Sequence, residues 1–163
     1  MDEHAIAPGD VSSIHVLASR AARDALVHPD PRTGLEAKFS LHYTVASAVA
    51  RDRVGLDAFE DGNLDHDGTQ RVRGRVTFEA DPVRDYGDHG AVVTMHTQDG
   101  RTVSHEQETP PGSLDSPLSD EQVRRKYRTC AGRALDDATV EWTYEALSSL
   151  REQDDLGDVV ARL

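Results

Sequence analysis

The chain has 163 residues, which is enough for one domain with a modest core, and only eight of them are aromatic. Acidic residues outnumber basic ones by 30 to 18, so the formal net charge is −12. A surface this acidic repels nucleic acid and anionic membranes, and we therefore expect neither as a partner. An anionic ligand would need a local cationic pocket.

The basic residues are dominated by arginine, since Lys38 and Lys126 are the only lysines, and twenty of the acidic residues are aspartate. Many aspartates with few lysines are typical of a salt-adapted cytoplasm, in which salt screens the repulsion between surface charges. We therefore hypothesise a halophilic source.

Cysteine usage and hydropathy favour an intracellular protein. Cys130 is the only cysteine, so no disulfide can form within the chain. We find neither a signal-peptide pattern nor an apolar run of about 18 residues, and we expect a soluble, cytoplasmic protein.

Residues 1–80 predict a strand, two helices and a second strand. Met1–Asp10 is polar and reads as a loose lead-in, and Val11–Ala18 alternates between apolar and polar residues as a strand does. Two prolines make residues 28–34 a loop. The spacing then predicts a helix over Glu36–Arg51. Three further expectations are a short helix at Leu56–Glu60, a loop over 61–69 and a strand at Gln70–Ala80.

A β-hairpin is the clearest local signal. Ala91–Thr97 and Thr102–Glu108 flank the turn sequence Asp99-Gly100, and Asp-Gly supplies the positive φ values of a two-residue hairpin turn. Counting outward from this turn places His96 opposite Val103.

Helices are predicted for the last third. Ser119 and Gln122 can form a capping box for a helix that runs to about Ala134. Asp136 or Asp137 can cap a further helix that ends near Leu150, and Leu156–Leu163 is predicted as a last short helix. The order of elements predicts an α+β fold with a mainly antiparallel sheet and helices packed on one side.

The run from Gly34 to Tyr43 carries the strongest functional pattern. Phe39, Tyr43, Ala46 and Ala50 recur at helical spacing, and Lys38 and His42 share the neighbouring stripe. A phenol near a cation can hold a carboxylate and transfer a proton. The alternative is a core tyrosine whose hydroxyl reaches one partner.

Metal and thiol chemistry have less support. Asn63–Gly68 resembles the front half of a calcium-binding loop, but Gly74 stands where a bidentate glutamate belongs, and we read residues 70 onward as a strand rather than the second helix. The histidines lack zinc-site spacing. Cys130 lies on an apolar stripe with Val123 and Tyr127, which favours a buried structural thiol.

Several of these segments, taken together, resemble one family. The run Ala37–Tyr43 (AKFSLHY), the Asp99–Thr102 turn and the Ser116–Glu121 segment, with Lys126-Tyr127 after it, match the order and spacing of motifs in the MmgE/PrpD family. That family includes 2-methylcitrate dehydratases, cis-aconitate decarboxylases and iminodisuccinate epimerases. The resemblance covers most of the chain and is to the smaller C-terminal domain.

The resemblance implies a fold, a chemistry and partners. It implies a domain of a lyase that acts on small di- and tricarboxylic acids without a metal or an organic cofactor. Tyr43 is implied as the catalytic residue, with Lys38, Ser40 and His42 as candidates for substrate binding. The large helical N-terminal domain of the family is absent from residues 1–163, so we expect a helical partner, and the resemblance also implies a homodimer. Two alternatives stay open, namely an inactive truncated remnant and a small binding module for an organic acid or a protein.

Overall fold

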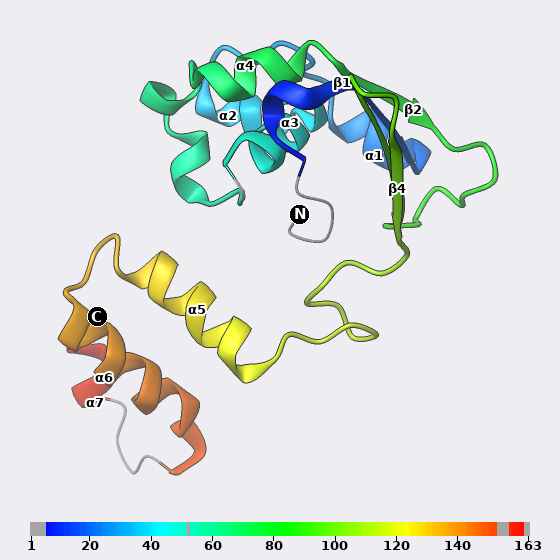
Figure 1. Ribbon diagram of the computed structural model, residues 1–163. Coiled ribbons are helices and arrows are strands. Elements are labelled where there is room, and N and C mark those ends of the chain that lie inside the picture. The colour runs from blue at the N-terminus through cyan, green and yellow to red at the C-terminus, as the bar shows by residue number, and fades with distance from the viewer. Residues whose placement is uncertain (1–5, 52, 153–156, 162–163) are drawn as a thin grey trace. The chain divides into compact units, whose positions relative to one another are not determined.

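The computed structural model describes residues 6–51, 53–152 and 157–161. The chain forms two compact units, Met1–Pro110 and Pro111–Leu163. The first contains the sheet and the helices that pack against it, and the second is helical (Figure 1). Of the expected lead-in, residues 1–5 lie outside the described residues, and Pro8–Asp10 forms a 3-10 turn that leads into the first strand.

The sheet of the first unit has four strands in the order β2-β1-β3-β4. Their bounds are Val11–Ala18 for β1, Val76–Ala80 for β2, Ala91–Thr97 for β3 and Thr102–Gln107 for β4. β1 runs parallel to β2 and antiparallel to β3, and β3 runs antiparallel to β4. The predicted α+β fold with a mainly antiparallel sheet is therefore confirmed.

Helices cover one face of this sheet. The first unit contains α1 (Arg20–Ala25), α2 (Gly34–Lys38), α3 (Leu41–Arg51) and α4 (Asp67–Arg73). In Figure 1, α2, α3 and α4 gather on the same side of the strands. The core lies between α3, α4 and the strands β1 and β2, and its buried members are Val11, Ile14, Val16, Leu41, Ala46, Val49, Val72 and Val76. These contacts agree with the prediction of helices on one side.

The helix predicted over Glu36–Arg51 is in fact two helices, α2 and α3. The side-chain oxygen of Ser40 accepts a hydrogen bond from the backbone N–H of Tyr43 at 3.1 Å and so caps the start of α3. Serine competes with the helical backbone for hydrogen bonds, which is why the chain breaks here. As a result Phe39 is 47% exposed and does not continue the apolar stripe of α3.

The strand predicted over Gln70–Ala80 is wrong in its first half, because residues 67–73 form α4. The imidazole of His66 caps this helix by accepting from the backbone N–H of Thr69 at 3.3 Å. Thr69 and Val72 are buried on one side of the helix, and β2 begins only at Val76. The expected loop over 61–69 likewise contains the 3-10 turn Asp61–Asn63 (η3) and the start of α4. The short helix expected at Leu56–Glu60 is the 3-10 turn Leu56–Phe59 (η2).

The β3–β4 hairpin is confirmed, but its turn is one residue longer than predicted. The backbone N–H of Thr97 donates to the carbonyl of Arg101 at 2.9 Å, so three residues form the loop. Gly100 takes a φ of +85°, the left-handed conformation that such a three-residue turn requires at its last position. His96 consequently lies opposite Thr102, not Val103.

Arg84 stabilises the connection between β2 and β3 through ion pairs with nearby carboxylates. Arg84 lies within 3.4 Å of Asp81 and 3.1 Å of Asp88, and it also pairs with Glu106 on β4.

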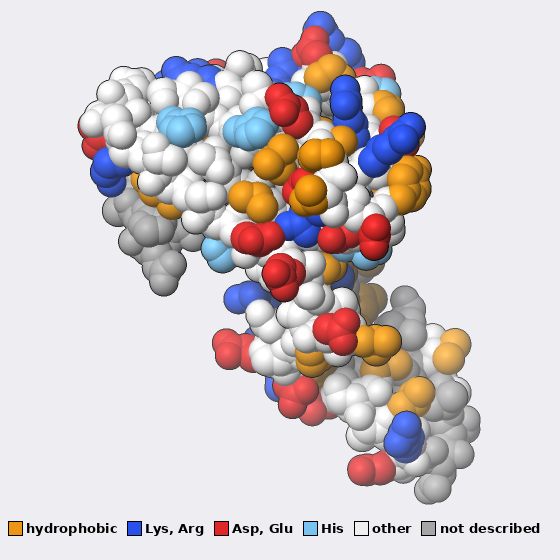
Figure 2. Space-filling view, turned by 90° about the vertical axis from the view of Figure 1, so that its right-hand side faces the viewer, with side chains coloured by type: hydrophobic (Ala, Val, Ile, Leu, Met, Phe, Trp, Pro, Cys, Tyr) orange, Lys and Arg blue, Asp and Glu red, His pale blue; other side chains and the backbone are white. Residues whose placement is uncertain are grey.

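Over the face shown in Figure 2, acidic and basic side chains are interspersed with hydrophobic ones. The net negative charge therefore does not prevent local pairing of arginines with carboxylates.

The second unit is built on α5 (Asp120–Ala131) and α6 (Asp137–Ser148). The predicted capping box of Ser119 and Gln122 is present, and Asp136 caps α6. A further 3-10 turn follows at Leu150–Glu152 (η4) and a short helix at Gly157–Val160 (α7). The remainder of the helix predicted for Leu156–Leu163 falls largely outside the described residues.

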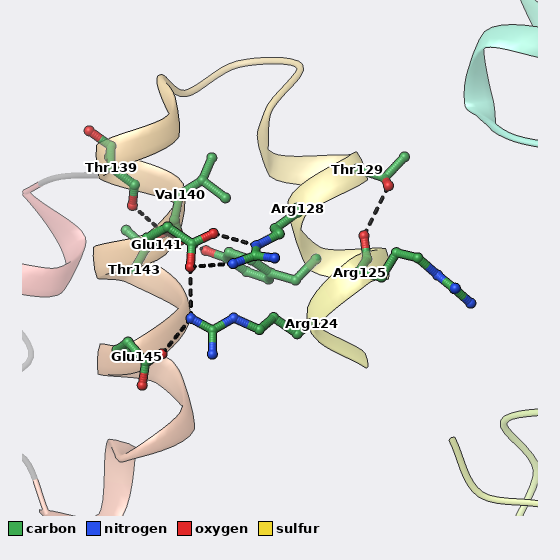
Figure 3. A network of polar contacts seen from close by, with 10 residues as sticks. Arg124, Arg125, Arg128, Thr129, Thr139, Val140, Glu141, Thr143 and Glu145 are labelled. Carbon is green, nitrogen blue, oxygen red and sulfur yellow. Dashed lines mark hydrogen bonds and ion pairs between the residues drawn. The ribbon is translucent and has the colours of Figure 1, made fainter. Parts of the chain in front are cut away.

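Polar contacts join α5 to α6 (Figure 3). Arg128 donates two hydrogen bonds to the carboxylate of Glu141 and Arg124 donates one. These bonds, those of Arg128 first, lower the pKa of Glu141 to about 2. The hydroxyl of Tyr127 donates to the hydroxyl oxygen of Thr143 at 2.7 Å. The two helices are thus held together by charge and hydroxyl pairing as well as by contact between the rings of Tyr127 and Tyr144.

The prediction of a buried structural thiol is wrong, because Cys130 is exposed. On the stripe that carries Cys130, Val123 is also exposed, whereas Tyr127 is half-buried against the ring of Tyr144. Among the described residues, no helix has the length and apolar character needed to cross a bilayer.

Candidate functional site

A polar cavity of about 300 Å³ opens in the first unit. It lies where the loop before α2, the segment after η2 and the helix α4 meet. Its lining residues are Asp30, Pro31, Arg32, Asp61, Leu64, Asp65, Gln70 and Arg73. The volume is at the lower end of the range for small-molecule sites, which suits a compact, polar ligand.

Asp30 joins the two arginines of the cavity. One oxygen of its carboxylate lies 2.6 Å from the guanidinium of Arg73, and the other lies 2.7 Å from that of Arg32. Prolines on both sides, Pro29 and Pro31, restrict the backbone that presents Asp30. Arg32 is further fixed because its backbone N–H donates to the carboxylate of Glu36 at 2.6 Å.

Two further side chains of the cavity, those of Asp61 and Gln70, are held by hydrogen bonds to backbone groups. Asp61 accepts from the N–H of Gly34 at 2.6 Å, and Gln70 donates to the carbonyl of Leu64 at 2.7 Å. Gly34 approaches η2 so closely that a Cβ placed there would lie 1.8 Å from the carbonyl oxygen of Phe59. Only glycine permits this approach, and it sets the position of the loop that carries Asp30 and Arg32.

Tyr43 lies behind the cavity and not in it. Its side chain is fully buried with Ala37 and Leu64, and its ring centroid is 6.1 Å from that of Phe59. Its hydroxyl donates to the backbone carbonyl of Ala58. Because Leu64 also lines the cavity, the phenol supports the wall of the cavity in this chain. A catalytic role for Tyr43 stays a prediction.

The three side chains predicted to bind substrate are placed differently. Lys38 ends α2 and is exposed, whereas Ser40 is buried and its side-chain oxygen is used in capping α3. His42 is in the first turn of α3, and its Nδ1 is buried without a hydrogen-bond partner. Burial, and to a lesser extent the charge of Arg73, lower the pKa of His42. Of the three, His42 is the residue whose pKa is influenced by a residue of the cavity lining, Arg73.

The charged residues of the cavity were missed by the sequence reasoning. The sequence pattern predicts a strand at Arg73, and it predicts a loop, with no function indicated, at Asp30 and Arg32. The available signal was the pattern of two prolines around Asp30 followed by Arg32, since such a loop is rigid enough to present a charge. Nothing local in the sequence connects this loop to Arg73.

The calcium-like segment Asn63–Gly68 has a different role. Its Asn63 side chain donates to the carbonyl of Asp57 at 2.9 Å, and Asp67 already belongs to α4. A helix does therefore follow the segment, contrary to the expected strand. Within the described part of the chain, no group of three or more His, Cys, Asp or Glu side chains is arranged to hold a metal ion.

Comparison with known proteins agrees with the sequence motifs. Residues 1–150 match the MmgE/PrpD C-terminal domain. The chain is also similar to a curated protein of Aspergillus oryzae named "cis-aconitate decarboxylase-like protein oryM", with 26% identity over 133 residues. That match covers 80% of this chain and 27% of the relative, so the chain spans about a quarter of the relative's length. The chain belongs to the MmgE/PrpD family, of which it carries the C-terminal domain.

Proposed function

We propose that the chain is the C-terminal domain of a lyase that acts on small di- or tricarboxylic acids and needs a helical domain for activity. The observation that carries this proposal is the family match over residues 1–150. The name of the Aspergillus relative supports decarboxylation of an unsaturated tricarboxylic acid, and the family resemblance also supports a dehydratase of the 2-methylcitrate type.

The arginines of the cavity support a carboxylic acid as the substrate, since arginine binds carboxylates through paired hydrogen bonds. Arg32 and Arg73 share the polar space of about 300 Å³ with three aspartates, and a substrate carboxylate would have to compete with Asp30 for both guanidiniums. The lowered pKa of His42 keeps its imidazole neutral near pH 7, and its buried Nδ1 has no partner. His42 does not line the cavity, so its imidazole is linked to the site through its electrostatic interaction with Arg73. Tyr43 would act by keeping Leu64 and η2 in place.

Exposed apolar side chains near α2 support a partner domain. Leu35 on α2 is 68% exposed and Phe39, directly after α2, is 47% exposed. Leu56 on η2, which packs against α2, is 43% exposed. Large exposed hydrophobic side chains beside a candidate site are typical of a surface that another domain covers. We propose the helical domain of the family as that partner, with catalysis occurring between the two.

The test is a lyase assay in high salt on citrate, 2-methylcitrate and cis-aconitate. The chain is assayed alone and together with a family helical domain, supplied on the same or on a separate polypeptide. We expect turnover only when both domains are present, and we expect Tyr43→Phe to reduce it. Tyr86→Phe is the control, because Tyr86 is 60% exposed and lies outside the cavity lining. Inactivity of the complete pair on all three acids would contradict the proposal.

A second candidate is a binding module for an organic acid. The observation in its favour is that residues 30–73 of this chain form the whole lining of the cavity. This candidate predicts that the chain binds an acid with the same affinity whether or not the helical domain is present. An inactive truncated remnant, by contrast, would neither bind an acid nor turn one over.

A further inference from the structure

We infer that the chain binds a phosphate group in a second, smaller cavity, which lies between α4 and the 3-10 turn Pro8–Asp10 (η1). This cavity, the arginine pocket, has a volume of about 50 Å³, and its lining residues are Pro8, Gly9, Gly68, Arg71 and Arg75. None of these residues lines the polar cavity described above, so the inference goes beyond the proposed function and does not depend on it.

The lining of the arginine pocket is cationic. It contains two arginines and no carboxylate, whereas the polar cavity sets three aspartates against two arginines. Within the described residues Asp67 pairs with Arg71, but the distance is 3.8 Å and both side chains are highly exposed, so this pair is weak. Asp10 of η1 is exposed and lies outside the lining. In a chain with a net charge of −12, an anion therefore meets a local excess of positive charge in this pocket.

Local structure brings the two arginines together. Arg71 lies in α4, and Arg75 follows Gly74, the C-cap of α4, whose φ of −67° and ψ of −7° are still helical. Residues four positions apart are neighbours on a helix surface, so both side chains line the same pocket. Arg75 is half-buried, and its Nη1 donates to the backbone carbonyl of Val11 at the start of β1. That bond uses one of the five guanidinium N–H donors and holds the group in place.

The opposite wall of the arginine pocket is held by the turn between β3 and β4. The side-chain amide of Gln98 donates to the carbonyl of Gly9 at 2.9 Å, and its backbone N–H donates to the carbonyl of Asp10 at 2.8 Å. The carbonyls of Gly9 and Val11 are thus satisfied by other parts of the chain. The side chains of the pocket offer a ligand guanidinium N–H groups, which are donors only and match an anion.

The size and charge of the pocket favour a phosphate group. A volume of about 50 Å³ is far below that of a site for a whole small molecule, so the pocket admits one compact group of a ligand. A phosphate ester carries a charge of about −1.5 to −2 near pH 7 and has three acceptor oxygens. Two guanidiniums supply the matching charge and bind such oxygens through paired hydrogen bonds. The group comes either from free inorganic phosphate or from a phosphorylated small molecule.

The experiment is a titration of the full chain at constant, high ionic strength, in which sodium phosphate replaces sodium chloride. NMR follows the backbone amides of Gly9 and Gly68, and thermal melts follow the stability. We expect saturable shifts at these two glycines and a higher thermal midpoint in phosphate, because a ligand that binds only the folded chain stabilises it. Shifts at the two glycines that do not saturate, or that chloride reproduces, would overturn the inference.

Variants of single arginines separate binding from the general effect of phosphate, which also stabilises proteins because it is excluded from their surface. Arg71→Gln should weaken phosphate binding roughly tenfold or more, as the loss of hydrogen bonds to a charged group does. Arg53→Gln is the matched control. Arg53 forms an equally exposed pair with Asp57 at 3.9 Å, also four residues apart, but lies outside the pocket. Equal phosphate affinities for the two variants would overturn the inference.

Two further variants test the same site in opposite directions. Asp67→Asn should tighten phosphate binding, because it removes the carboxylate that competes for Arg71. Arg75→Gln should weaken it, and circular dichroism shows whether that variant keeps its fold after losing the bond to Val11. Weaker binding by a folded Asp67→Asn chain would contradict the role given to Arg71.

A comparison of ligands identifies the group and its source. Acetate, which has two acceptor oxygens and a single charge, should bind roughly tenfold or more weakly than phosphate, and equal binding would overturn the choice of phosphate. Glycerol 3-phosphate is compared with inorganic phosphate. Similar or tighter binding of the ester upholds the site and assigns it to a phosphorylated small molecule, whereas much weaker binding upholds it for free phosphate. Because no lyase assay is involved, failure here leaves the proposed function untouched.

Discussion

The hydroxyl of Tyr43 on α3 donates a hydrogen bond to the backbone carbonyl of Ala58 in η2, and both residues are shielded from solvent. The bond joins α3 to the segment that precedes Leu64, a residue of the cavity wall. A tyrosine singled out by a family motif thus has an identifiable task within this chain alone. Tyr43 stabilises the cavity wall through its packing against Leu64 and its hydrogen bond to Ala58.

Replacing Tyr43 with phenylalanine should destabilise the chain. The buried carbonyl of Ala58 would lose its partner, and an unsatisfied buried polar group costs about 1–3 kcal/mol of unfolding free energy. Urea denaturation followed by circular dichroism measures this loss. Tyr86→Phe, which alters an exposed hydroxyl, should change the midpoint little. Equal midpoints for the wild type and Tyr43→Phe would show that the bond does not contribute.

Gly34→Ala should damage the first unit far more than Gly62→Ala. A Cβ at position 34 would lie 1.8 Å from the carbonyl oxygen of Phe59, and backbone cannot yield as a flexible side chain can. Nothing lies within 4 Å of the corresponding position at Gly62. We expect Gly34→Ala to cost about 2–3 kcal/mol, as overpacking does, and Gly62→Ala to be nearly neutral. Thermal melts of the two variants provide the comparison, and similar melts would contradict it.

The pKa of His42 should lie below its ordinary value of 6.5, and the positive charge of Arg73 should account for part of this lowering. Burial is the larger cause, so Arg73→Gln should raise the pKa of His42 without restoring it fully. Because the folded-state pKa is lowered, the contribution of His42 to stability is present above pH 6.5 and is lost as the pH falls through the folded pKa. NMR titration of the imidazole protons tests both statements. Arg71→Gln is the control and should leave the titration unchanged.

Elements with a complete local signal could be predicted from the sequence. Alternation predicted β1, Asp-Gly predicted the hairpin and Ser119 predicted the start of α5, because each depends on residues close together in the chain. The break at Ser40 could not be predicted because the helical spacing of Phe39, Tyr43 and Ala46 runs across it, and the start of α4 could not because histidine is not among the residues preferred at helix N-caps. The cavity could not be predicted, because the pairing of Asp30 with Arg73 arises only when the intervening segments have folded.

The link between α5 and α6 should weaken in acid. The pKa of Glu141 is lowered to about 2 from an ordinary value of 4.5, first by Arg128 and then by Arg124. Its contribution to stability is therefore present above pH 4.5 and is lost as the pH falls through about 2. Glu141→Gln should remove this dependence from the NMR signals of the two helices. An unchanged acid transition in that variant would assign the effect to other carboxylates.

The acidic composition predicts that the chain needs salt. With a net charge of −12, its surface charges repel one another, and this repulsion is screened only at high ionic strength. We expect the thermal midpoint to rise with potassium chloride concentration and the folded signal to weaken on desalting. Full stability in low-salt buffer would remove the case for a halophilic source.

The position of β1 in the sheet has a consequence for biosynthesis. It is synthesised before the other strands of this sheet, yet its two neighbours, β2 and β3, begin at Val76 and Ala91. Until those strands are made, Val11, Ile14 and Val16 have no sheet to enter, and both edges of the strand are open. The nascent chain therefore exposes an unpaired apolar strand, which can associate with other chains, while α1 to α4 are synthesised.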